Sequence, residues 1–165
     1  MRSLRSIDSR MICRQSPCIL SPVPLQIRVV RLHPRARLPS RATPTASGFD
    51  LHACLDAAMM LGRHPQLVPT GLAFETPAGL DVQVRPRSGL SLKGVGVAFG
   101  TIDADYRGEV LATMWTFGDL DSYELQDGDR IAQVVVATLP AVELVEVSEL
   151  SASSRGAGGH GSTGR

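Results

Sequence analysis

Short apolar runs, separated by turn residues, follow one another from position 25 to position 147. The runs cover 25–32, 67–75, 80–86, 94–102, 109–117, 130–139 and 141–147. LDVQVR at 80–85 alternates apolar and polar residues with a period of two, which is typical of a half-buried strand. Gly, Pro and Asp punctuate the runs, as in turns between strands. Eight or so short strands with no long helical pattern predict an all-β sandwich, jelly roll or barrel.

The rest of the chain divides by composition. ACLDAAMML at 53–61 is the one stretch that suits a helix, and it is short. Residues 1–24 contain four arginines and one acid, and two interpretations are open: an organellar transit peptide, or an unstructured extension that includes a start codon placed too early. Three prolines within this stretch interrupt any long amphipathic helix and favour the extension. We therefore expect a β domain over 25–150 and a flexible Gly-rich C-terminal arm over 151–165.

Composition excludes several classes of protein. The formal net charge of +1 does not favour binding to nucleic acid or to an anionic membrane. Aromatic residues make up only 4% of the chain, so the core must consist mainly of Val, Leu, Ile and Ala. Three cysteines without CxxC spacing argue against a disulfide framework or a zinc site, and they indicate a reducing, cytoplasmic environment. No apolar run approaches the roughly 20 residues of a membrane span, so we expect a soluble protein.

The stretch GTIDADYRGE at 100–109 carries the most informative chemistry. It predicts a β-hairpin with a polar turn before the returning strand EVLATMW. An Asp at a strand end can hold a water for general-base catalysis, and a nearby Tyr offers a flat face to a ring. An ordinary Asp-rich turn with a Tyr packed over it is the alternative, which the stretch alone favours.

Three further stretches suit a phosphate-bearing ligand. RPRSGL at 85–90 combines two arginines, a hydroxyl and a Gly that permits close backbone approach. In GDRIAQ at 128–133, Gln133 enters a very apolar strand, where it either donates to a ligand oxygen or is a satisfied polar side chain. In ASGFDL at 46–51, Asp50 opens a strand as a turn cap or as a partner of a metal through water. Each stretch alone also fits a plain polar turn.

The C-terminal stretch GAGGHG at 156–161 matches GxGxxG, a pattern associated with phosphate binding. A nicotinamide-binding fold would need a strand before this stretch, a helix after it and an acid about 20 positions further on. The sequence has none of these, so the match indicates ligand chemistry without that fold.

Taken in order, ASGFDLHA, RPRSGLSLKG, GTIDADYRGE, GDRIAQVVV and RGAGGHGSTG resemble the five motifs of the trimeric dUTPase family. The resemblance runs from about Leu25 to the C-terminus, and GTIDADYRGE followed by GDRIAQ and a terminal RGxGG is its most specific part. It implies a β jelly roll and a homotrimer whose active sites collect motifs from all three chains. It also implies hydrolysis of dUTP to dUMP and pyrophosphate, usually with Mg²⁺, which keeps uracil out of DNA and supplies dUMP for thymidylate synthesis.

The resemblance also implies roles for individual residues. Asp103 would orient and deprotonate the water that attacks the α-phosphorus, and the ring of Tyr106 would lie against the deoxyribose and exclude a 2′-hydroxyl. The backbone of Thr101, Ile102 and Asp103 would receive uracil. The remaining candidates are, for the phosphates, Arg87, Ser88, Gly89, Gln133 and Arg155; for closure of the arm over the nucleotide, His160, Gly161 and Ser162; and, for Mg²⁺ through water, Asp50.

The sequence departs from the family pattern at two places. The segment before the hairpin, 93–100, is about three residues shorter than is common and lacks an Asn that contacts uracil. His160 replaces the usual Phe of the arm. Two other functions stay open: a dCTP deaminase of the same fold, and a non-catalytic nucleotide-binding trimer. The IDADYRGE stretch and Gly89 favour uracil hydrolysis over deamination.

Overall fold

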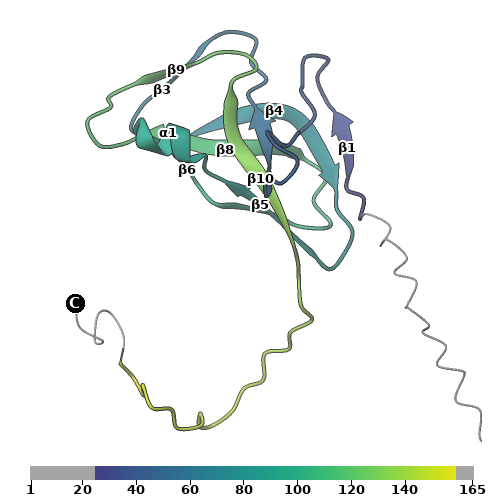
Figure 1. The fold of residues 1–165 in the computed structure, drawn as a ribbon, viewed down its shortest axis with the longest axis vertical. Helices are drawn as coiled ribbons and strands as arrows, with labels where there is room; N and C mark the ends of the chain where they lie inside the picture. Colours follow the sequence, from purple (N-terminus) through teal and green to yellow (C-terminus); the bar gives the residue numbers. More distant parts are fainter. Residues whose placement is uncertain (1–24, 159–165) are drawn as a thin grey trace, which may run out of the picture.

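The computed structural model describes residues 25–158, which form two four-stranded antiparallel sheets packed face to face (Figure 1). The strand order is β1-β4-β8-β6 in one sheet and β2-β10-β5-β7 in the other, and a small β3-β9 pair lies at one end. The elements are β1 (Arg28–Arg31), β2 (Gly48–His52), β3 (Met59–Leu61), β4 (Gln66–Glu75), β5 (Leu80–Arg85), α1 (Ser88–Leu92), β6 (Val95–Val97), β7 (Gly100–Ile102), β8 (Glu109–Thr116), β9 (Tyr123–Leu125) and β10 (Arg130–Thr138). The predicted all-β jelly roll is confirmed.

Aliphatic side chains from the two sheets form the core between them. Alternate residues of β5, among them Val82 and Val84, point inward, and Ala112 and Met114 of β8 do the same from the opposite sheet. Phe74 is the only aromatic residue among the buried core residues of the described chain. The core is therefore built from aliphatic residues, as the low aromatic content predicts.

The apolar run at 94–102 is two strands instead of one. β6 pairs with β8 in the first sheet, whereas β7 pairs with β5 in the second. The predicted hairpin at 100–109 is consequently wrong as a hydrogen-bonded pair, because β7 and β8 belong to different sheets. The 103–108 turn instead carries the chain from one sheet across to the other.

The predicted helix at 53–61 is also wrong. Its first backbone N–H groups donate to distant partners: Ala53 to the Asp129 carbonyl (2.8 Å), Cys54 to the Pro69 carbonyl (2.9 Å) and Leu55 to the Asp127 carboxylate (2.9 Å). The last three residues form β3 and pair with β9, a short strand that the pattern did not predict. Tertiary hydrogen bonds outweigh the local preference for a helix here.

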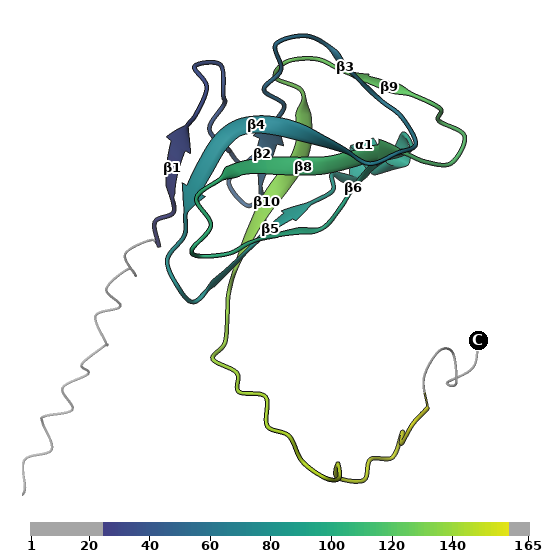
Figure 2. The ribbon, with the colours of Figure 1, turned by 180° about the vertical axis from the view of Figure 1, so that it is seen from behind.

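The run at 141–147 does not form a strand, and none of the described residues pairs with it. After β10 the chain leaves the sandwich and runs away from it in an extended path (Figure 2). Its apolar side chains are exposed, with Leu144 at 95% and Val142 at 73%. One helix that the pattern did not predict, α1, follows β5 directly. No helix in residues 25–158 is long and apolar enough to cross a membrane.

A bulge in β4 fixes the start of β8. The register of the β4–β8 pair shifts between Pro69 and Ala73, where Gly71 adopts a φ of 67° that favours glycine. The Gly71 N–H donates to the Glu109 carboxylate (2.7 Å), and the buried Thr70 hydroxyl donates to the Val110 carbonyl (2.6 Å). Both bonds satisfy groups that the bulge would otherwise leave unpaired, and both anchor the end of the 103–108 turn.

Candidate active site

Asp50 lies at the centre of a charged cluster at one end of the second sheet. It stands on β2 opposite Gln133 of β10, which in turn pairs with Arg85 of β5. The Arg87 Nε donates to Asp50 Oδ1 (3.0 Å), and the Arg130 Nη1 donates to Oδ2 (3.2 Å). The Asp50 side chain is only 13% exposed, whereas that of Arg130 is 52% exposed. One carboxylate therefore orients two arginines, each of which keeps donors free for a ligand.

Gln133 holds the backbone that leads into α1. Its Nε2 donates to the carbonyl of Pro86 (2.9 Å), and its side chain packs on Gly48, where a Cβ would lie 2.9 Å from Gln133 Cδ. Without a Cβ, Gly48 lets β10 present this amide. Gln133 thus has a structural partner in the chain, and its Oε1 accepts no hydrogen bond from the described residues.

Ser88 and Gly89 begin α1, with Arg87 at its N-cap. Both residues are exposed, and a Cβ at Gly89 would meet no atom within 4 Å. Since Arg87 is fixed by Asp50, the start of α1 lies beside the arginine cluster. The sequence prediction of a plain polar turn after β5 is therefore refined to a short helix.

Asp103 follows the last residue of β7 and is exposed to solvent. The turn that it opens is held by its own backbone and side chains. The Tyr106 N–H donates to the Asp103 carbonyl (3.1 Å), and the Tyr106 hydroxyl donates to the Glu109 carbonyl (3.0 Å). Arg107 donates to the carbonyls of Ala104 (2.7 Å) and Tyr106 (2.9 Å). Asp103 is thus presented on an ordered turn with its carboxylate unpaired among the described residues.

The Tyr106 ring lies over Gly108, where a Cβ would come within 2.6 Å of Tyr106 Cζ. Glycine at this position leaves the room that the ring occupies. Tyr106 as a whole residue is 45% exposed, so part of its surface stays open to a ligand.

The two groups of candidate residues lie at opposite ends of one strand pair. Val84 pairs with Gly100, and from this pair the antiparallel strands run in opposite directions. Arg87 follows β5 at one end, and Asp103 follows β7 at the other. The fold therefore brings Asp50, Arg87 and Gln133 together but separates them from the turn that carries Asp103.

Three cluster residues received no role from the sequence. Arg130 was visible within GDRIAQ, but its pairing with Asp50 depends on the register of β2 and β10. His52 stands two positions before Cys54, a spacing that could suggest a metal-ligand pair but supplies too few ligands for a zinc site, and Arg37 carried no signal of its own. The Arg37 guanidinium packs over Gly128, at the turn before β10. Burial lowers the pKa of His52, and the neighbouring positive charge of Arg37 lowers it further.

Arg155 is exposed in a turn of the C-terminal segment, where its Nε donates to the Gly158 carbonyl (2.7 Å). Its side chain makes no hydrogen bond or ion pair to the sandwich within residues 25–158. His160, Gly161 and Ser162 lie outside the described residues.

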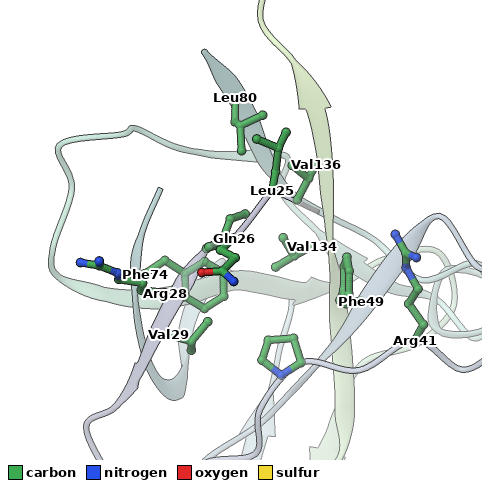
Figure 3. Close-up of a pocket in the computed structure, with 12 residues that line it drawn as sticks. Leu25, Gln26, Arg28, Val29, Arg41, Phe49, Phe74, Leu80, Val134 and Val136 are labelled. Carbon is green, nitrogen blue, oxygen red and sulfur yellow. The ribbon is translucent and has the colours of Figure 1, made fainter. Parts of the chain in front are cut away.

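One cavity in the described part of the chain is lined by none of these residues. It has a volume of about 610 Å³ and an apolar lining contributed by the segment that leads into β1 and by β2, β4 and β10, including Phe49, Phe74 and Val134 (Figure 3). No site residue that the sequence predicts lines it.

A jelly roll with an arginine cluster at one end of a sheet and an unpaired carboxylate on a turn defines a class of protein suited to a phosphate-bearing ligand. The chain belongs to the dUTPase family: the model of that family matches residues 34–164. The deoxyuridine 5′-triphosphate nucleotidohydrolase of Solibacter usitatus is 50% identical over 146 residues, which cover 86% of this chain and 97% of the relative. That of Nautilia profundicola is 43% identical over 144 residues, covering 86% and 100%.

A solved structure agrees with the fold. The dUTPase of Staphylococcus bacteriophage 80alpha, with bound dUPNHPP, superposes with a TM-score of 0.75 at 28% sequence identity, over 85% of this chain and 99% of that chain. The resemblance that the five motifs indicated is confirmed.

Proposed function

We propose that this protein hydrolyses dUTP to dUMP and pyrophosphate, in the cytoplasm, and thereby keeps uracil out of DNA and supplies dUMP for thymidylate synthesis. The observation that carries the proposal is the unpaired Asp103 carboxylate on the ordered 103–108 turn, in a chain of the dUTPase family. The free thiol of Cys54 suits a reducing environment.

Asp103 accepts a proton from the attacking water. The water oxygen forms a bond to the α-phosphorus, the bond from that phosphorus to the bridging oxygen breaks, and pyrophosphate leaves with the electron pair. Asp103 needs no covalent role, because such a displacement depends mainly on positioning and on stabilisation of charge. The exposed position of this carboxylate, without an ion-pair partner among the described residues, suits a general base.

The arginine cluster receives the phosphates. Arg87 and Gln133 contact them together with Ser88 and Gly89 of α1, and Arg155 of the arm adds a positive charge. Asp50 keeps the Arg87 guanidinium in one orientation, so little conformational entropy is lost when a phosphate binds. Charge-assisted hydrogen bonds of this kind are stronger than neutral ones.

Uracil binds to the backbone of Thr101, Ile102 and Asp103, and the open face of Tyr106 packs on the deoxyribose. Because Tyr106 donates to the Glu109 carbonyl, its ring is fixed where a 2′-hydroxyl would collide. The arm 151–165 closes over the nucleotide, with His160, Gly161 and Ser162 nearest to the base and sugar.

Mg²⁺ fits this site only as part of the substrate complex. Among residues 25–158 there is no group of three or more His, Cys, Asp or Glu side chains that could hold a metal ion. Both oxygens of Asp50 accept hydrogen bonds from arginines, which leaves lone pairs for water rather than a direct bond to a metal. When bound to the triphosphate, Mg²⁺ neutralises phosphate charge, and Asp50 would reach it through water.

The separation of Arg87 and Asp103 supports a homotrimer with shared sites. The register of β5 and β7 supports this arrangement, because within one chain the phosphate cluster and the Asp103 turn face different ends of the sheet. A neighbouring chain supplies the missing part of each site.

Release of pyrophosphate from dUTP, dCTP, dTTP and UTP, measured side by side with and without Mg²⁺, tests the proposal. We expect rapid release from dUTP alone, which is lost when Mg²⁺ is chelated. Ammonia released from dCTP would instead identify a deaminase. Binding of dUTP without release of either product would identify a non-catalytic trimer.

A further inference from the structure

Between β6 and β7 the chain changes sheets within two residues, Ala98 and Phe99. The Ala98 N–H still donates to the Thr113 carbonyl of the first sheet (2.9 Å), whereas Gly100 already pairs with Val84 in the second. Phe99 is 75% exposed, compared with 45% for Tyr106 and 43% for Phe117. A large apolar ring is therefore held at a tight crossover and left uncovered by its own chain.

The residues that follow Phe99 show which face of β7 is the outer one. A Cβ at Gly100 would point to Val84, 3.5 Å from its Cβ, and Val84 is buried in the core. Because side chains alternate along a strand, Thr101 of β7 points to the outer face. Phe99 precedes β7 in the crossover, and it is exposed to solvent as Thr101 is. Two residues of a strand span about 6.6 Å, which is within reach of an aromatic side chain.

We propose that Phe99 contacts the uracil ring of the substrate and serves as a base-recognition residue; this inference rests on the proposed function. The polar edge of uracil is read by the backbone of Thr101 to Asp103, which leaves the apolar part of the ring to be covered. The segment 93–100 has no Asn to contribute a polar contact. The exposed aromatic ring of Phe99, two residues before Thr101, supplies an apolar contact instead.

The experiment compares Phe99→Ala and Phe99→Leu with wild type in the full-length protein. Phe117→Ala is the matched control, because Phe117 is also an exposed Phe but follows β8, beside Gly94 at the far end of the β6–β8 pair. Contacts between aromatic side chains and bases contribute about 1–3 kcal/mol, so we expect Phe99→Ala to raise KM for dUTP at least about fivefold, with kcat within about twofold of wild type. The KM of Phe99→Leu should lie between the values of wild type and Phe99→Ala, and the KM of Phe117→Ala should match that of wild type.

Separate ligands distinguish base recognition from a structural role. Calorimetric titration with dUMP should show weaker binding by Phe99→Ala, in parallel with KM, whereas inhibition by pyrophosphate should be unchanged. Unchanged dUMP affinity would overturn the proposal. The proposal would also be overturned if Phe99→Ala changed the apparent mass on gel filtration and lost affinity for dUMP and pyrophosphate equally. Phe99 would then be a contact between chains. If wild type binds dUMP but does not hydrolyse dUTP, the proposed function fails while the dUMP comparison still tests Phe99.

Discussion

Asp103 is the residue whose loss should separate binding from chemistry. Asp103→Asn keeps the size of the side chain but removes the proton acceptor, so we expect turnover to fall by about 10²–10⁴-fold. Affinity for a non-hydrolysable dUTP analogue and the assembly state should be retained. Steady-state pyrophosphate release and calorimetry measure the two effects. Near-normal turnover by this variant would remove Asp103 from the role of base.

Asp50 should matter for stability as well as for phosphate binding. In Asp50→Ala, the partly buried Arg87 loses its carboxylate, and we expect the free energy of unfolding to fall by about 1–3 kcal/mol. Glu75→Ala is the control, because it breaks the exposed pair with Arg28 and should cost no more than about 1 kcal/mol. Urea denaturation of both variants tests the difference. Equal losses in the free energy of unfolding would mean that the Asp50 cluster stabilises the fold no more than an exposed ion pair does.

His52 should make stability depend on pH. Its pKa is lowered by burial and then by Arg37, so the unfolded chain binds a proton at a higher pH than the folded protein does. Stability is therefore full above about pH 6.5, the ordinary His pKa, and falls as the pH is lowered towards the depressed value. We expect the free energy of unfolding to decrease between pH 7 and pH 5, and the decrease to be smaller in His52→Gln. Identical pH profiles would contradict this.

At the scale of elements, the bulge in β4 connects the core to the 103–108 turn. Glu109→Ala removes the acceptor of the Gly71 N–H, and an unpaired buried donor costs about 1–3 kcal/mol. Glu109→Gln keeps an acceptor oxygen and should cost less than about 1 kcal/mol. Chemical denaturation distinguishes the two variants, and equal stabilities would show that the bulge is satisfied in another way.

Strands that alternate strictly could be predicted from the sequence because one face must be buried. β5 and β8 agree with their predicted ranges to within about one residue. The run 94–102 could not be divided into two strands from the sequence, because nothing in this mainly apolar stretch indicates where the chain changes sheets. The helix expected at 53–61 failed because its backbone bonds to partners more than ten residues away. The strand expected at 141–147 is largely apolar, but it pairs with none of the described residues of its own chain.

The candidate site was predictable as a set of residue types and not as an arrangement. Asp103, Arg87 and Gln133 stand out within their motifs. The pairing of Arg130 with Asp50 depends on the register of two strands some 80 residues apart in sequence, which no local pattern records. The separation of Asp103 from Arg87 depends in the same way on the register of β5 and β7.

At the scale of the whole molecule, two inactive chains should restore one another. We expect Arg87→Gln and Asp103→Asn to be nearly inactive alone. Co-expressed or refolded as a mixture, they should form trimers in which some sites take Arg87 from one chain and Asp103 from another. Random mixing should recover about a quarter of wild-type turnover, if each shared site needs one intact group from each of two chains. A mixture no more active than its components would place each site within one chain.

The opposed ends of the β5–β7 pair also set a limit on the protein as a catalyst. A monomer, however well folded, would contain two half-sites that lie too far apart to act on one substrate. The activity per chain would then depend on the protein concentration. Dilution below the concentration at which the chains associate would remove activity without unfolding the chains. The cell could therefore adjust this reaction through the number of chains it makes, and the response would be steeper than proportional near that threshold.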